Sequence, residues 1–120
     1  MIKLRPQHIQ LFDELAERLF VKRMVEHVQY NFTSQCEGKT PDAIRERVIA
    51  QIEKAKTHHI TSKQDICDFI GLCFLFGDKL GEDYQTAWAS KILNDEKLHY
   101  DGGLMMAKLN QEASKHLPID

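Results

Sequence analysis

Three cysteines carry the most reactive side chains of this sequence, and their surroundings argue against nucleophilic catalysis. Cys67 and Cys73 lie in the most apolar segment of the chain, where a thiol usually packs as an inert small side chain. Cys36 lies in the polar stretch 33–39, which we expect to be a loop with an incidental surface thiol. An odd number of cysteines without a paired framework indicates free thiols in a reducing compartment, and we predict a cytoplasmic protein.

Six histidines could supply metal ligands, but their spacing predicts no metal site. His58 and His59 are adjacent, so in a helix they point in different directions and cannot easily share one ion. The sequence has no His-Glu-x-x-His or Cys-x-x-Cys motif, and Cys67 and Cys73 would lie ~240° apart around a helix. We therefore predict neither a metal nor another cofactor.

Carboxylates are frequent, but their positions are typical of helix caps and solvated helix faces. Asp68 is the exception inside the apolar segment; we assign it a contact with the helix dipole in the first turn, with a buried functional carboxylate as the alternative. No Gly-x-Ser-x-Gly motif occurs, and Gly102-Gly103 lacks the features of a phosphate loop. We predict no catalytic residue and no enzyme, unless folding brings His27, His99 and Asp101 together.

The apolar pattern around these residues predicts an all-α fold, in which residues 1–120 form a single-domain bundle of about five helices. The long first helix is expected to begin at Pro6 and the second after the Thr40-Pro41 cap. Segment 66–76 is apolar almost all round, so we expect the third helix to be the central element, with Ser62 as its cap and Gly77 at its end. The five expected helices span about 6–32, 41–58, 63–76, 84–93 and 101–116.

The first helix carries two apolar stripes that differ in direction by roughly 100° on a helical wheel. Phe12, Leu15, Ala16 and Leu19 form the first stripe, and we expect the long helix to wrap over its own core. The rotated second stripe could instead face another protein. The candidate protein-binding residues are Val21 and Val25 on this helix, and Tyr84 and Trp88 near the Gly81 turn; the alternative for the two aromatic residues is core packing.

The charge distribution excludes several classes of partner. Net charge is −2, with a net +2 in residues 1–60 and −4 in residues 61–120, which is too weakly polarised to predict nucleic-acid binding. We also exclude a DNA-binding helix-turn-helix motif, because the helix 63–76, which would have to enter the major groove, has no arginine. No apolar run approaches the ~20 residues of a membrane span, so we predict no membrane contact.

Several segments together resemble a family of small helical bacterial proteins. These segments are Leu4-Arg5-Pro6-Gln7, residues 60–70 (ITSKQDICDFI), Leu75-Phe76-Gly77, and Trp88 with Ile92-Leu93. The family is encoded beside effectors of the type VI secretion system and their adaptors; where it has Phe-Asp and Pro-Trp pairs, this chain has Lys79-Leu80 and Ala87-Trp88. The resemblance implies an accessory role in loading an effector onto the secretion spike, and it supplies no catalytic residues.

The leading functional hypothesis is a non-enzymatic adaptor or co-chaperone that binds a secretion effector, or the effector's adaptor, through an apolar helical face. The alternative is an immunity protein that neutralises a bacterial toxin by binding it, for which the acidic second half of the chain would suit a basic nuclease. The sequence leaves the oligomeric state and the identity of the protein partner open.

Overall fold

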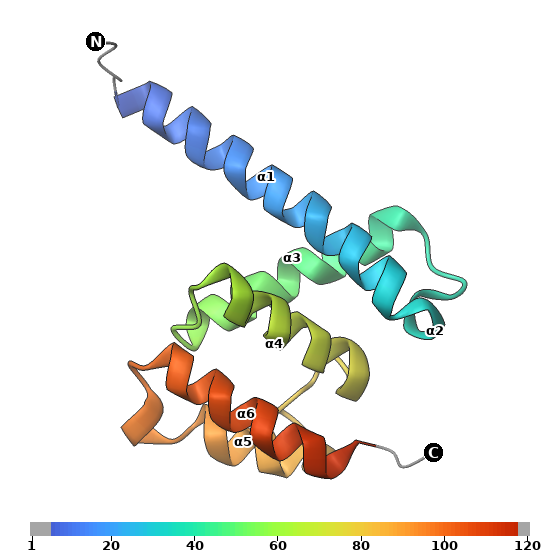
Figure 1. Cartoon of the computed structure of the whole chain (residues 1–120), viewed down its shortest axis with the longest axis vertical. Helices are drawn as coiled ribbons and strands as arrows, with labels where there is room; N and C mark the ends of the chain where they lie inside the picture. Colours follow the sequence, from blue (N-terminus) through green and yellow to red (C-terminus); the bar gives the residue numbers. More distant parts are fainter. Residues whose placement is uncertain (1–5, 118–120) are drawn as a thin grey trace. The chain divides into compact units, whose positions relative to one another are not determined.

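The computed structural model describes the backbone of residues 6–117 and the side chains of residues 14–117. Its regular structure over this range is entirely helical, with no strand, which confirms the predicted all-α fold (Figure 1). Five helices have seven or more residues, as the sequence predicts. The elements are α1 (Pro6–Asn31), α2 (Thr33–Cys36), α3 (Pro41–Thr57), α4 (Lys63–Phe76), the 3-10 helix η1 (Tyr84–Thr86), α5 (Ala87–Leu93), the 3-10 helix η2 (Glu96–Leu98) and α6 (Gly102–His116).

The contacts along the chain form two compact units, residues 1–48 and residues 49–120. Helix α3 runs through the boundary, because it spans Pro41–Thr57. Each unit is described by itself below. That all 120 residues fold as one domain stays a prediction.

Short polar side chains fix where the helices of the second unit begin. The Ser62 hydroxyl accepts a hydrogen bond from the Asp65 amide at 3.1 Å, and the Asp101 carboxylate accepts one from the Leu104 amide at 3.0 Å. Each satisfies an amide that the first turn of a helix leaves without an intrahelical partner. Gly77 ends α4 at φ 106°, a conformation that suits glycine because it has no Cβ.

Helix α4 buries most of its surface, as expected for a helix that is apolar almost all round. In the second unit α6 packs against both α4 and α5, so the apolar sides of these three helices form one core. Phe69, Ile70 and Cys73 of α4 and Met105, Met106 and Leu109 of α6 are completely buried.

The first half of α1 departs from the expectation that this helix covers a core. Leu15 is 43% exposed and Leu19 is 55% exposed, while Ala16 is exposed and the Phe12 side chain lies outside the described residues. The first unit supplies few elements to cover them: α2 follows the far end of α1, and the first turn of α3 lies beside residues 18–29. Leu15, Ala16 and Leu19 are therefore surface residues.

The stretch 33–39, predicted as a polar loop, contains the short helix α2. Its Cys36 is half-buried instead of exposed, and the thiol donates a hydrogen bond to the Val28 carbonyl at 3.6 Å. Phe32, at φ −125° and ψ 51°, separates α2 from α1, and the two helices are joined by the bonds from the Phe32 amide to the Val28 carbonyl and from the Cys36 amide to the Phe32 carbonyl. A single apolar residue in a polar stretch was too little signal to predict this turn.

Candidate functional site

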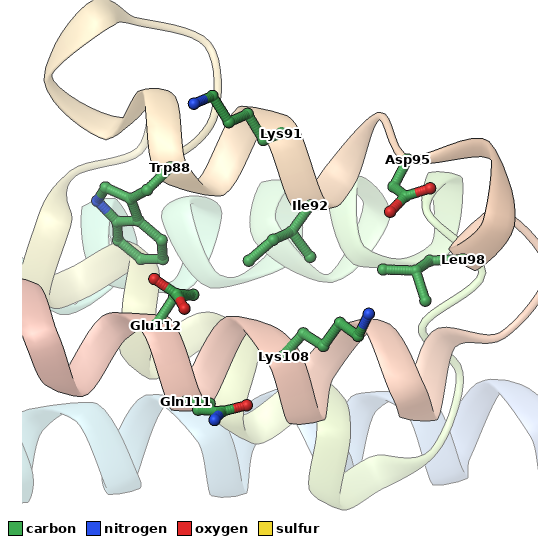
Figure 2. A pocket seen from close by; sticks show the side chains of 8 residues that line it. All are labelled: Trp88, Lys91, Ile92, Asp95, Leu98, Lys108, Gln111 and Glu112. Atoms are coloured by element: carbon green, nitrogen blue, oxygen red, sulfur yellow. The ribbon is translucent and has the colours of Figure 1, made fainter.

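An open groove of about 550 Å³ runs between α5 and α6 in the second unit (Figure 2). Its apolar surface comes from Trp88 and Ile92 of α5 and from Leu98 of η2. Figure 2 shows Ile92 pointing from α5 toward α6, with Trp88 at one end and Leu98 at the other. The complete lining is Trp88, Lys91, Ile92, Asp95, Leu98, Lys108, Gln111 and Glu112.

Trp88 is held in place by two other rings. Its indole stacks on the His116 imidazole with ring centroids 4.9 Å apart and an angle of 5° between the planes. The Phe76 ring meets it edge-on at 5.2 Å and 73°. The tryptophan is therefore fixed by the ends of α4 and α6 and stays only half-buried, so part of a large aromatic surface remains open to the groove.

Two lysine side chains in the groove lining carry positive charges that are not used in ion pairs with described residues. Lys91 of α5 and Lys108 of α6 have no ion-pair partner within 4.0 Å among the side chains of residues 14–117. The two acidic groups of the lining already have partners: Asp95 Oδ1 accepts a hydrogen bond from the Lys97 amide at 2.9 Å, and Glu112 pairs with Lys115 at 3.0 Å. The groove thus combines an apolar floor with two ammonium groups available to a ligand.

The four candidate binding residues occupy different surroundings. Trp88 lines the groove, whereas Tyr84 lies in η1, 87% exposed and outside the groove lining. The core-packing alternative is therefore wrong for Tyr84. In the first unit Val25 is half-buried beside a smaller groove of about 410 Å³, and Val21 is only 6% exposed. Val21 offers a partner almost no surface.

Sequence reasoning missed most of the groove lining. Ile92 was not among the predicted binding residues, yet it lies one turn after Trp88 on the same face of α5, which is the signal that could have placed it in the site. Lys108 and Glu112 have the same four-residue spacing on α6. That these two faces meet depends on how α5 and α6 pack together, which the local pattern does not state.

Among the residues that the structure describes, no three or more histidine, cysteine or carboxylate side chains are placed to hold a metal ion. Burial, followed by the nearby Asp68 charge, raises the pKa of the Cys67 thiol, which disfavours the thiolate. His99 meets the rings of His59 and Tyr100, and His27 belongs to the other unit.

Asp68 corrects the expectation of a first-turn dipole contact. The acidic residue in the first turn of α4 is Asp65, and Asp68 lies one turn later. Its carboxylate accepts hydrogen bonds from Gln64 Nε2 at 3.0 Å and from Asn110 Nδ2 at 3.4 Å. Because Asn110 belongs to α6, Asp68 links two helices of the second unit.

The sequence matches no known protein family, and no curated protein or solved structure is significantly similar to it. None of the helices in residues 6–117 is long and apolar enough to cross a membrane.

Proposed function

We propose that this chain is a non-enzymatic adaptor or co-chaperone that binds a protein partner in the groove between α5 and α6. The observation that carries the proposal is the half-buried Trp88 beside two unpaired lysines in a groove of about 550 Å³. Aromatic side chains that are fixed before binding contribute strongly to protein interfaces, because little conformational entropy is lost when a partner covers them. The two lysines would fix the orientation of the bound partner by pairing with its carboxylates.

The specific partner we propose is a type VI secretion effector or that effector's adaptor. The support is the resemblance of segments 60–70 and 75–77 and of Trp88 to small helical proteins encoded beside such effectors. Binding would take place in the cytoplasm, where Cys36, Cys67 and Cys73 stay reduced. The exposed Leu15 and Leu19 of α1 give the chain a second apolar surface, so one partner could be held on each unit.

The test is affinity capture of the tagged chain from its native cells, with mass-spectrometric identification of bound proteins. In the test variant, Lys91→Glu and Lys108→Glu reverse both groove charges. The matched control, Lys63→Glu with Lys79→Glu, makes the same charge change at exposed lysines outside the groove lining. We expect the unaltered chain and the control to capture an effector or its adaptor, and the groove variant to bind at least about tenfold more weakly.

Equal capture by all three chains would contradict the groove as the binding site, and the absence of any effector or adaptor would contradict the proposed partner. Co-expression with the captured protein separates an adaptor from an immunity protein. An adaptor leaves the toxicity of an effector unchanged, whereas an immunity protein restores growth because it blocks the toxin's active site.

A further inference from the structure

The walls of the groove between α5 and α6 offer a ligand side chains but few backbone partners. Residues 6–117 contain no strand, so this range has no sheet edge to which an extended peptide could add by backbone hydrogen bonds. The amides and carbonyls of α5 and α6 bond within the helices, apart from those at the helix ends. An extended peptide would bury its own backbone groups without partners, which costs free energy. A helix satisfies its backbone internally and fits such a groove without that cost.

The apolar side chains of the groove are spaced for the apolar face of a helix. Trp88 and Ile92 are one turn apart on α5, ~6 Å along its axis, and Figure 2 shows the buried Leu98 beyond them. Apolar side chains at positions i, i+4 and i+7 of a bound helix follow one another at a similar interval. Grooves that bind proline-rich segments are instead lined by several aromatic rings, and Trp88 is the one aromatic residue among the described lining residues.

The charge of the groove is positive and comes from both of its helices. Lys91 lies on α5 and Lys108 on α6, and both side chains are exposed. Of the two acidic lining residues, Glu112 pairs with Lys115 at 3.0 Å, which leaves Asp95 against the two lysines. Two positive charges and one negative charge give a net charge of +1. An occupant with carboxylates on both sides of its apolar face complements this charge.

We propose that the partner occupies the groove with an amphipathic helix whose apolar stripe has acidic residues on both flanks. The stripe packs on Trp88 and Ile92, and the acidic flanks pair with Lys91 on one side and with Lys108 on the other. The inference rests on the proposed function, because it names the part of the partner that the groove recognises. The indole ring of Trp88, already held by His116 and Phe76, gives the helix an ordered surface to pack against.

Zero-length crosslinking of the complex purified from native cells tests this pattern, because a carbodiimide joins an ammonium group to a carboxylate that it contacts. We expect crosslinks from Lys91 and Lys108 to Asp or Glu residues of one partner segment of about ten residues, on opposite flanks of its apolar stripe. Lys63 and Lys79, exposed and outside the groove lining, are the internal controls and should not link to that segment. Crosslinks from the two groove lysines to separate segments, or to none, overturn the inference.

A synthetic, ¹³C-labelled peptide copy of the crosslinked segment tests its conformation. On addition of the unlabelled chain, the Cα chemical shifts of the peptide should move to helical values, and the emission of Trp88, the single tryptophan, should change. A peptide that binds without becoming helical overturns the inference.

Reversal of charge on both molecules tests the acidic flanks. Replacing the acidic residues of the peptide with lysine should weaken its binding at least about tenfold. The variant with Lys91→Glu and Lys108→Glu, both at exposed positions, should bind this reversed peptide more tightly than the unaltered chain does. Reversed and original peptides that bind both chains equally overturn the inference.

The outcomes separate this inference from the proposed function. A partner that binds in the groove through an extended segment, a proline-rich segment or several loops supports the proposed function and overturns the helix. A chain that binds no partner contradicts the proposed function, and this inference with it.

Discussion

Gly102 and Gly103 are adjacent in sequence but meet very different surroundings at the start of α6. A Cβ added to Gly102 would lie 2.7 Å from the His59 carbonyl carbon and 2.8 Å from the Ile60 Cα. Both are backbone atoms, which cannot rotate away as the end of a side chain can. A Cβ on Gly103 would meet only side-chain oxygens, the nearest at 3.7 Å.

We expect Gly102→Ala to lower the free energy of unfolding by about 1–3 kcal/mol, because the end of α3 must move away from α6. Gly103→Ala is the matched control, and it should be neutral or stabilise the protein by up to about 1 kcal/mol, because alanine favours helix. Urea unfolding followed by circular dichroism gives both values. Equal stabilities of the two variants would contradict the close contact at Gly102.

At the scale of elements, two polar side chains of α3 hold the turn 78–82 that follows α4. Lys54 Nζ donates to the Leu80 carbonyl at 2.8 Å and to the Asp78 carbonyl at 3.2 Å, and pairs with Glu82 at 3.4 Å. Gln51 Nε2 donates to Asp78 Oδ1 at 2.6 Å. Gln51 is only 3% exposed, and its Oε1 has no hydrogen-bond partner among the residues that the structure describes. Helix α3 therefore adds polar contacts to a turn that is also held by the bond from the Gly81 amide to the Thr86 hydroxyl.

Lys54→Met keeps most of the side-chain stem but removes the ammonium group that reaches the turn. We expect the free energy of unfolding to fall by about 1–2 kcal/mol, because the part-buried Leu80 carbonyl and the more exposed Asp78 carbonyl lose a charged donor. Amides of the turn 78–82 should also exchange faster. Lys97→Met, at an exposed position, is the control and should change stability by less than about 0.5 kcal/mol. Equal losses in the two variants would contradict the role given to Lys54.

The helices could be predicted from the sequence because their signals are local. Ser62, Gly77 and Asp101 act through atoms a few residues away, so the bounds of α4 and α6 follow from residue type and spacing. The exposure of Leu15 and Leu19 on α1 could not be predicted, because an apolar helical pattern does not state whether another element covers it.

The candidate site could be predicted only in part for the same reason. Trp88 could be predicted as a binding residue because aromatic side chains are frequent in protein interfaces. Lys108 could not, because it lines the groove only through the packing of α6 beside α5. The grouping of the His59, His99 and Tyr100 rings could not be predicted, since 40 residues separate His59 from His99 in the sequence. Its signal is the close approach of the α3 end to Gly102, which requires the folded structure.

At the scale of the whole molecule, the proposed function places binding on surfaces that the fold leaves uncovered. The second unit builds its core from α4, α5 and α6 and still presents the groove with Trp88. The first unit presents Leu15 and Leu19 on α1. Exposed apolar side chains beside charged groups are typical of interaction surfaces. Under the proposed function, the chain would bind its partner without forming or breaking a covalent bond.

The most direct test is a hydrogen-exchange footprint of the complex purified from native cells, compared with the free chain. If a partner lies in the groove, slower exchange should concentrate in peptides covering 88–98 and 108–112, the segments that contain its lining residues. Emission of Trp88, the single tryptophan of the chain, should change in the same complex. A chain that co-purifies with no partner, or a complex with unchanged exchange in both segments, would contradict the account.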